Sequence, residues 1–208
     1  MAEAVVHVID DDEAMRDSLS YLLESAGIDA RTYESATEFL RGINSVGAGC
    51  IVTDVRMPEL NGLDLVRHLR EQGVNLPVIV MTGHADVPLA VEAMKAGAVE
   101  FLEKPFEDEV LMRAIQTALR GGSAAQDPTE KKRLRAIFDA LSPREQQVLD
   151  GVVAGKMNKV IAFELGISPR TVEVYRASLM SKMQAKSLAE LVRTVMGIDL
   201  GALGQPSG

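Results

Sequence analysis

An aspartate follows a buried-strand pattern in the first half of the chain. Residues 50–52 are apolar, Asp54 follows after one threonine, and Pro58 then prevents the chain from continuing as strand or helix. This pattern predicts a parallel strand with a carboxylate at its C-terminal end, where open α/β sheets bind their ligands. A helix cap or a turn residue is the alternative interpretation of Asp54, because aspartate favours both positions.

Three further strand patterns end in polar residues. These residues are Asp10 and Asp11 after residues 5–9, Thr82 after residues 77–81, and Lys104 after residues 99–102. Helical patterns separate the strands, so we expect five strands alternating with five helices around one parallel sheet with right-handed crossovers. The strand ends then share one edge, and their polar side chains should lie together.

The polar residues at this predicted edge suit phosphoryl transfer. A cluster of carboxylates favours Mg²⁺, which binds one or two carboxylates together with water and phosphate oxygens. Asp54 can act as the nucleophile and form an aspartyl phosphate. Lys104 and the metal would neutralise the phosphoryl oxygens, and the Thr82 hydroxyl would hydrogen-bond one of them.

The strand-end residues resemble the signature of response-regulator receiver domains. The matching strings are Asp10-Asp11, Asp54 with Met57-Pro58, Thr82-Gly83 and Lys104-Pro105-Phe106, within about residues 4–121. The resemblance implies a flavodoxin-like (βα)5 fold in which a histidine kinase phosphorylates Asp54. It also implies that Asp11, Asp54 and the backbone carbonyl of Arg56 bind Mg²⁺, with Asp10 nearby.

The same resemblance implies a switch in the receiver domain. Thr82 and Phe101 occupy the positions of a pair in which the hydroxyl moves to the phosphate and the aromatic ring follows inward. Plain core packing is an equally good interpretation of Phe101. The resemblance further implies a cis peptide bond between Lys104 and Pro105, and a dimer surface near Val91 and Lys95.

The chain beyond residue 121 has a different character. Residues 121–126 have linker composition, and cap, proline and glutamate signals follow at Asp127 and at Ser142. A connecting helix and four short helices should result, with a tight turn at residues 166–168 between the second and third short helices. Two helices joined in this way form the helix-turn-helix arrangement.

The C-terminal helices resemble the output domain of the NarL/FixJ group, also called LuxR-type. The matching strings include Leu141 to Glu145, Asn158-Lys159, Ile161-Ala162, Thr171-Val172 and Lys182-Met183. The resemblance implies binding to double-stranded DNA by a transcriptional activator that works with RNA polymerase. Two routes of activation stay open: dimerisation on phosphorylation, or release of the DNA-binding domain from an inhibitory contact. Further strings, including residues 168–174, resemble the nitrogen-fixation regulators of this group and imply such genes as targets.

The candidate DNA contacts lie on or near the predicted recognition helix. They are Lys156, Lys159, Arg170, Thr171, Glu173, Val174, Arg176, Ala177 and Lys182. The lysines suit phosphates, while arginine can bind guanine and apolar side chains can meet a thymine methyl group. For Glu173 two interpretations remain open: it accepts a hydrogen bond from cytosine, or it is a solvated carboxylate.

Charge and composition agree with two parts of different function. Residues 1–124 hold 10 Lys and Arg against 21 Asp and Glu, a net −11, whereas residues 125–208 hold 12 against 9, a net +3. The second part is therefore the one expected to meet a polyanion. The single cysteine, Cys50, excludes an internal disulfide, and no apolar run reaches the ~18 residues of a membrane span.

The sequence thus predicts a cytoplasmic regulator with no membrane partner and no enzymatic activity beyond accepting phosphate and slow self-dephosphorylation. We expect a receiver domain at residues 1–121, a linker and connecting helix at 122–141, and a DNA-binding domain at 142–208. The main alternative is a Mg²⁺-dependent phosphatase with an aspartyl nucleophile. That enzyme needs a second acid two residues after the nucleophile, where Arg56 stands. A phosphorylation-independent adaptor that binds RNA or protein is the third hypothesis.

Overall fold

The chain forms two compact units. A computed structural model describes residues 4–84, 87–120, 128–185 and 187–197. The first unit comprises Met1–Ala85 and Lys95–Gly122, and the second comprises Asp86–Met94 and Ser123–Gly208. The domain boundaries predicted after residues 121 and 141 stay a prediction. Within the described ranges, no helix has the length and apolar character needed to cross a membrane.

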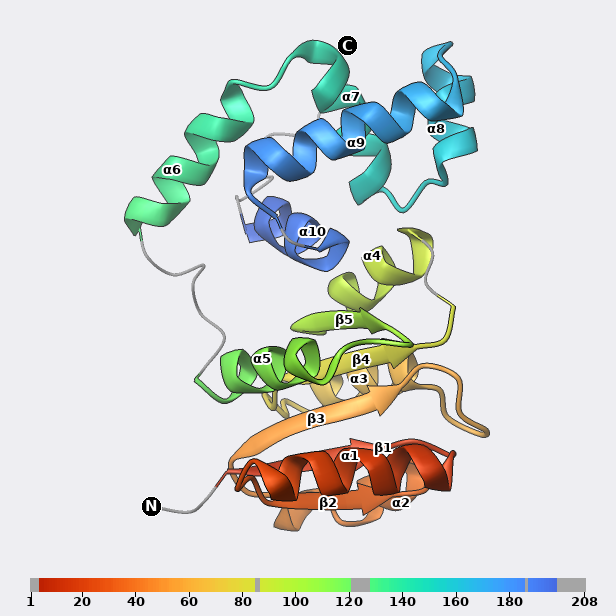
Figure 1. The fold of residues 1–208 in the computed structure, drawn as a ribbon, viewed down its shortest axis with the longest axis vertical. Coiled ribbons are helices and arrows are strands. Elements are labelled where there is room, and N and C mark those ends of the chain that lie inside the picture. Colours follow the sequence, from red (N-terminus) through yellow and green to blue (C-terminus); the bar gives the residue numbers. More distant parts are fainter. Residues whose placement is uncertain (1–3, 85–86, 121–127, 186, 198–208) are drawn as a thin grey trace. The chain divides into compact units, whose positions relative to one another are not determined.

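A five-stranded parallel sheet forms the centre of the first unit (Figure 1). Its strands are β1 (Val5–Ile9), β2 (Ala30–Tyr33), β3 (Gly49–Asp54), β4 (Val78–Thr82) and β5 (Glu100–Glu103). They lie in the order β2-β1-β3-β4-β5, and every adjacent pair is parallel. The order reverses at β1, so the carboxyl ends of β1 and β3 border the position where open α/β sheets bind ligands. The predicted parallel sheet is confirmed.

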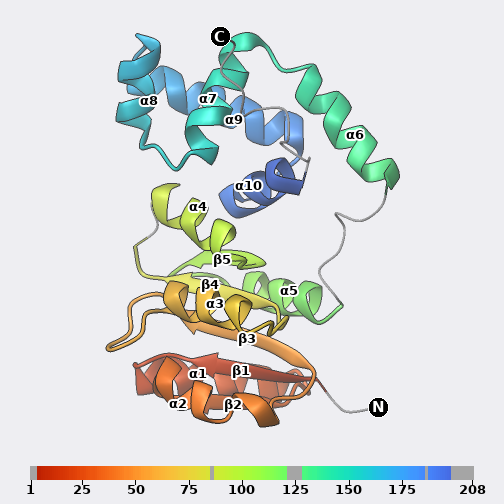
Figure 2. The same cartoon turned by 180° about the vertical axis from the view of Figure 1, so that it is seen from behind.

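Helices cover both faces of this sheet. They are α1 (Glu13–Ser25), α2 (Ala36–Arg41), α3 (Gly62–Glu71) and α5 (Asp108–Leu119), with a short 3-10 turn at Ile43–Ser45; α4 (Val87–Ala96) connects β4 to β5. α1 and α5 lie on one face, and α2 and α3 lie on the other (Figures 1 and 2). Leu19, Leu23, Leu111 and Ile115 form one core layer together with Val52 and its neighbours on the strands. Burial on both faces explains why the strands are almost continuously apolar in sequence.

The end of β3 packs closely against the start of α3. The side chain of Asn61 caps α3 by accepting a hydrogen bond from the backbone N–H of Asp64. The backbone N–H of Gly62 donates to the carbonyl of Val55 at 3.0 Å. A Cβ atom at Gly62 would lie 2.1 Å from the carbonyl oxygen of Asp54, so only glycine permits this approach.

The second unit contains a helical core. Its helices are α6 (Pro128–Asp139), α7 (Pro143–Val153), α8 (Asn158–Leu165), α9 (Pro169–Met183) and α10 (Leu188–Gly197). Buried side chains from all five helices form one cluster, which includes Phe138, Leu149, Ile161, Leu179 and Val195. The predicted connecting helix, α6, therefore packs on this core.

Local signals define the turn between α8 and α9. Gly166 ends α8 with a φ of 64°, in the left-handed region that glycine enters without steric cost. Ser168 caps α9 by accepting a hydrogen bond from the backbone N–H of Thr171, and Pro169 is the first helical residue. These residues produce the predicted helix-turn-helix arrangement.

A buried histidine lies on β1. His7 is 2% exposed, and its Nδ1 lies 3.1 Å from the Tyr33 hydroxyl. Phe39 packs edge-on against both rings. Within the described residues, Nε2 of His7 has no hydrogen-bond partner. Burial first, and the charge of Arg31 second, lower the pKa of His7 from 6.5, so the folded protein holds this side chain neutral.

Acid should therefore destabilise the first unit through His7. The unfolded chain binds a proton near pH 6.5 that folded His7 rejects, so stability falls as the pH drops below 6.5. We expect His7→Leu to flatten the dependence of the urea midpoint on pH between pH 7 and 5. An unchanged profile in His7→Leu would contradict the prediction.

Candidate functional site

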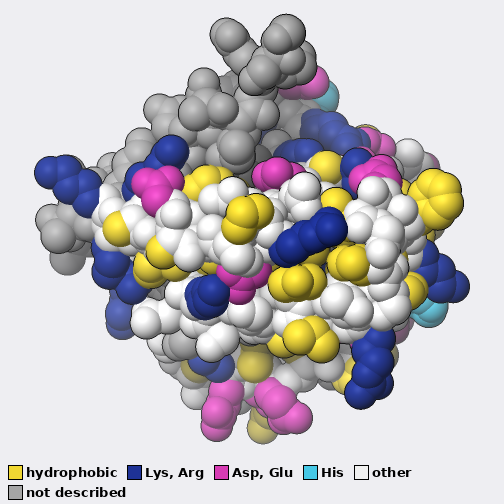
Figure 3. All heavy atoms as spheres, turned by 90° about the horizontal axis from the view of Figure 1, so that it is seen from above, with side chains coloured by type: hydrophobic (Ala, Val, Ile, Leu, Met, Phe, Trp, Pro, Cys, Tyr) yellow, Lys and Arg dark blue, Asp and Glu magenta, His cyan; other side chains and the backbone are white. Residues whose placement is uncertain are grey.

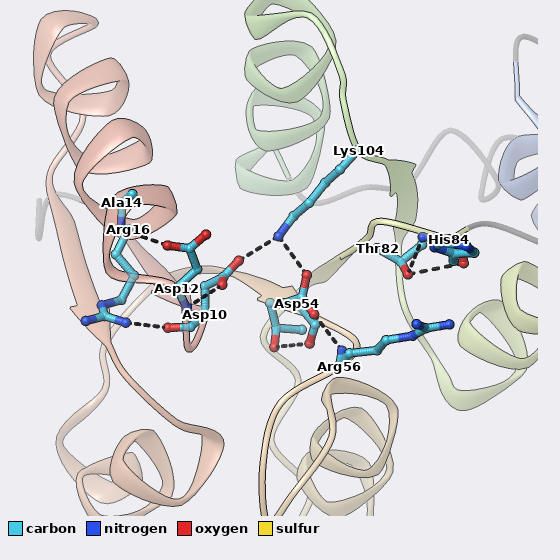
Figure 4. Close-up of polar contacts among 10 residues, drawn as sticks. Asp10, Asp12, Ala14, Arg16, Asp54, Arg56, Thr82, His84 and Lys104 are labelled. Atoms are coloured by element: carbon cyan, nitrogen blue, oxygen red, sulfur yellow. Dashed lines mark hydrogen bonds and ion pairs between the residues drawn. The ribbon is translucent and has the colours of Figure 1, made fainter.

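Two buried carboxylates share one ammonium group at the carboxyl edge of the sheet. Lys104 Nζ lies 2.7 Å from Asp10 Oδ2 and 2.7 Å from Asp54 Oδ1 (Figure 4). Asp10 is 2% exposed and Asp54 is 7% exposed. The three residues come from the ends of β1, β3 and β5, and the fold brings them together as predicted from the strand ends.

The charge of Lys104 is maintained by its two partners. Burial alone disfavours the ammonium form, but the hydrogen bonds and charges of Asp10 and Asp54 outweigh it and raise the pKa of Lys104. Two carboxylates and one ammonium leave an excess of negative charge at the edge. The cluster therefore attracts a further cation.

Backbone groups hold the two carboxylates in place. Asp54 Oδ2 accepts a hydrogen bond from the backbone N–H of Arg56, and Asp10 Oδ1 accepts one from that of Asp12 at 3.0 Å. Asp12 itself caps α1 through the N–H of Ala14 (Figure 4). Each carboxylate thus has one oxygen on Lys104 and the other on the chain that follows its strand.

The donor set suits Mg²⁺ bound with water and phosphate. Asp11 directly follows Asp10 in the chain and is exposed, and carboxylate oxygens match the hard oxygen ligands that Mg²⁺ prefers. In the described part of the chain, no three His, Cys, Asp or Glu side chains form a metal-binding group by themselves. This is compatible with Mg²⁺, which uses one or two carboxylates and keeps several waters. The roles predicted for Asp10, Asp11, Asp54 and the Arg56 carbonyl stay a prediction.

Thr82 is buried at the end of β4, next to the cluster in the sheet. Its hydroxyl donates to the carbonyl of His84 and accepts from the N–H of His84, both at 3.2 Å (Figure 4). Phe101 on β5 pairs with Val80 on β4 and is also buried. The hydroxyl must leave His84 before it can bind a phosphate on Asp54. Both interpretations of Phe101, switch and core residue, remain open.

The backbone between β5 and α5 has one predicted special feature. The Lys104–Pro105 peptide bond is cis, which confirms the expectation from the resemblance. Val91 on α4 is buried and Lys95 is exposed. The dimer surface predicted around these two residues stays a prediction.

One face of α9 is exposed to solvent. Arg170, Glu173, Val174 and Ala177 all lie on it, and Val174 is 64% exposed. Thr171 is half-buried, and its backbone N–H and hydroxyl both contact the Ser168 hydroxyl. Four of the five residues predicted to point outward are thus exposed, whereas the fifth, Arg176, is half-buried. Contact of this face with DNA stays a prediction.

Three other predicted DNA contacts are paired within the protein. Arg176 Nη1 donates to Asn158 Oδ1 at 2.9 Å, and Lys182 Nζ lies 2.7 Å from Glu145 Oε1. Lys156 Nζ pairs with Glu164 at 2.7 Å. Lys159 is exposed. Sequence patterns do not reveal such partners, because two of the pairs join different helices and the third joins the connection before α8 to α8 itself.

Glu145 is a residue whose wider role the sequence did not reveal. Its capping box with Ser142 was evident from the spacing, and the structure contains it. Glu145 also accepts hydrogen bonds from Ser178 and Lys182 of α9, each at 2.8 Å, and is 4% exposed. The bonds from Lys182, Ser142 and Ser178 hold the pKa of Glu145 at about 2.

Basic side chains are dispersed over one face of the molecule. On the face drawn in Figure 3, Lys and Arg side chains are spread among hydrophobic and uncharged ones, with acidic side chains between them. This agrees with the modest net charge of +3 for residues 125–208. A surface of this kind gives weak nonspecific attraction to DNA, so sequence-specific contacts matter more.

Comparison with known protein families assigns both units. Residues 6–116 match the response regulator receiver domain, and residues 139–195 match the bacterial regulatory proteins of the luxR family. The first match contains the Asp10–Asp54–Lys104 cluster, and the second contains α7, α8 and α9.

Similar proteins combine the same two domains over their full length. Transcriptional regulatory protein FixJ of Bradyrhizobium diazoefficiens is 53% identical over 92% of this chain and 94% of that protein. FixJ of Rhizobium meliloti is 50% identical over 97% of this chain and 99% of that protein. The crystal structure of full-length FixJ from B. japonicum has a TM-score of 0.56 at 50% identity, covering 96% of this chain and 99% of that chain. The chain therefore belongs to the two-component response regulators that join a receiver domain to a LuxR-type DNA-binding domain.

Proposed function

We propose that phosphorylation of Asp54 by a partner histidine kinase switches DNA binding by the LuxR-type domain. The observation that carries this proposal is the shared contact of Lys104 with Asp10 and Asp54, both buried at the carboxyl edge of the sheet. A buried nucleophile beside a fixed cation is suited to a reaction in which negative charge builds up on phosphoryl oxygens.

The chain's own residues account for most of the chemistry. A carboxylate oxygen of Asp54 attacks the phosphorus of the donor, and the bond from phosphorus to the donor histidine nitrogen breaks. Lys104 neutralises one phosphoryl oxygen, and Thr82 binds another after its hydroxyl leaves His84. Mg²⁺, held by Asp11, Asp54 and the Arg56 carbonyl with Asp10 nearby, would supply further neutralisation of the phosphate.

The phosphorylated form then gains operator affinity. Movement of Thr82 and Phe101 changes the surface that includes Val91 and Lys95, which we propose as the dimer contact. Two LuxR-type domains in a dimer reach two half-sites and compensate for the weak charge of each. Slow hydrolysis of the aspartyl phosphate resets the switch.

The target genes follow from the relatives. Because similar proteins are named FixJ and one relative is named nodulation protein W, we propose that the chain activates nitrogen-fixation genes together with RNA polymerase. We also propose that it acts in the cytoplasm, where a bacterial DNA target is accessible.

A DNA-binding titration tests this function. Purified chain is titrated against duplex DNA selected from a random library, with and without acetyl phosphate and Mg²⁺. We expect affinity to rise with the phosphodonor and to fall steeply as salt is raised. Equal affinity in both conditions would exclude the switch, and affinity that does not depend on salt would exclude the proposed DNA binding.

Lys104→Met should slow phosphorylation strongly. The methionine keeps the length of the side chain but leaves Asp10 and Asp54 without their shared cation. Loss of one electrostatic stabiliser of a transition state typically costs a factor of about 10² in rate. The rate of labelling by acetyl phosphate in Mg²⁺ measures the effect. Arg41→Met, which removes an exposed cation from α2, serves as the control, and equal rates in the two variants would contradict the assignment.

A further inference from the structure

The recognition helix α9 is tied to α8 near its middle. Arg176 Nη1 donates to Asn158 Oδ1 at 2.9 Å, and Asn158 is the first residue of α8. Arg176 is half-buried, and this burial lowers the pKa of Arg176 while the charge of Glu173 opposes the shift. If Arg176 turned outward, its guanidinium would lose the hydrogen bond to the Asn158 amide oxygen and its partly buried position.

The same helix is tied to α7 further along. Ser178 and Lys182 both donate to the carboxylate of Glu145, at 2.8 Å each. Glu145 also belongs to the capping box that starts α7, so its position is fixed by the backbone of Ser142. This second tie therefore joins α9 to a well-fixed point.

The two ties lie on opposite flanks of the exposed face. With about 3.6 residues per turn, successive residues of α9 are separated by about 100° around its axis. The exposed residues, Arg170, Glu173, Val174 and Ala177, then cover an arc of about 100°. Arg176 lies about 60° beyond one end of this arc, and Ser178 and Lys182 lie about 40° to 80° beyond the other. Together the ties oppose rotation of α9 in either direction.

We propose that Arg176 is a positioning residue for DNA recognition, which fixes the rotation of α9 through Asn158 and contacts neither base nor phosphate itself. Sequence reading is then confined to the exposed set Arg170, Glu173, Val174 and Ala177. This replaces the expectation from the sequence that Arg176 meets DNA directly.

The two roles differ in their response to salt and to partner substitution. A phosphate contact contributes about one unit to the slope of log affinity against log salt, whereas a positioning residue contributes none. A base contact depends on the fork of arginine, which lysine cannot reproduce. A positioning bond to Asn158 depends only on a donor within reach, which lysine can supply. Removal of either member of a positioning pair also has the same effect as removal of both.

The test uses the full chain with acetyl phosphate and Mg²⁺, and two probes: a duplex selected from a random library by the wild type, and a scrambled duplex of equal length. The variants are Arg176→Ala, Asn158→Ala, their combination and Arg176→Lys. Lys159→Met, which removes an exposed cation from α8, serves as the reference for a phosphate contact.

We expect each single alanine variant to weaken binding to the selected duplex about tenfold, a change of about 1.4 kcal/mol. The double variant should be no weaker, Arg176→Lys should bind like the wild type, and the salt slope should stay unchanged. A slope lowered by about one unit in Arg176→Ala, as expected for Lys159→Met, would overturn the proposal. The proposal would also be overturned if the double variant showed the summed affinity losses of the two single variants. A tenfold loss of affinity in Arg176→Lys would overturn it as well.

Two checks keep these outcomes distinct. The proposal rests on DNA binding by the LuxR-type domain, so a wild type without selectivity refutes that function and not the role of Arg176. If Arg176→Ala does not fold, Arg176→Lys and Asn158→Ala decide alone: the proposal requires the first to bind normally and the second to lose about tenfold.

Discussion

Asp54→Asn should abolish the effect of a phosphodonor on DNA affinity while leaving the fold intact. Asparagine keeps the size of the side chain and one oxygen for Lys104, but its amide is not a nucleophile for phosphorus. The variant should therefore bind DNA with the affinity of the unphosphorylated wild type, whether or not acetyl phosphate is present. Phosphate incorporation, measured by intact-protein mass spectrometry, should fall to background.

The matched control for this variant is Asp17→Asn. It removes an equal charge from an exposed position on α1, and we expect it to be phosphorylated at the wild-type rate. Incorporation of phosphate into Asp54→Asn would show that another residue accepts it. If acetyl phosphate still raised the DNA affinity of Asp54→Asn without any phosphate incorporation, its effect would not depend on Asp54.

Glu145→Ala should destabilise the second unit. The change removes the capping box of α7 and the acceptor for Ser178 and Lys182 of α9. The lost cap and the lost hydrogen bonds to a buried carboxylate together cost about 2 kcal/mol, which corresponds to about 30-fold faster opening. Hydrogen exchange with mass spectrometry should show this acceleration in α7 and α9 and not in the β-sheet.

The dependence on pH gives a second measurement of the same interaction. The pKa of Glu145 is about 2 in the folded chain against 4.5 for the ordinary side chain. Its stabilising effect is therefore complete above about pH 4.5 and is lost as the pH falls toward 2. The difference in stability between the wild type and Glu145→Ala should therefore shrink as the pH falls from about 4.5 toward 2.

The control for Glu145 is Glu164→Ala. This change breaks a similar pair with Lys156, but both side chains are more than one-third exposed, so the cost should be under about 1 kcal/mol. If hydrogen exchange were accelerated equally in the two variants, the burial of Glu145 and its capping box would contribute nothing to stability.

The sheet and its polar edge were predictable because they depend on local patterns. Apolar runs that end in polar residues predicted four of the five strands, and parallel order alone placed Asp10, Asp54 and Lys104 together. The helix-turn-helix followed from cap residues and from Gly166, which is also local information. Periodicity likewise identified the exposed face of α9.

Contacts between helices were not predictable in this way. Arg176 and Lys182 have the charge and position of DNA contacts, yet each bonds to a residue at the start of another helix. The hydrogen bonds of the Thr82 hydroxyl to the backbone of His84 were likewise not evident from the sequence. Such partners depend on packing angles and loop paths, which a single sequence does not specify.

The close approach of Gly62 to the carbonyl oxygen of Asp54 limits how the receiver can respond to phosphate. The end of β3 has no room to shift toward α3, since even one added carbon would meet that oxygen at 2.1 Å. On its other side, Asp54 pairs with Met81 of β4, whose next residue is Thr82. We therefore expect a change caused by phosphorylation of Asp54 to pass through the sheet toward β4 and β5 more readily than toward α3.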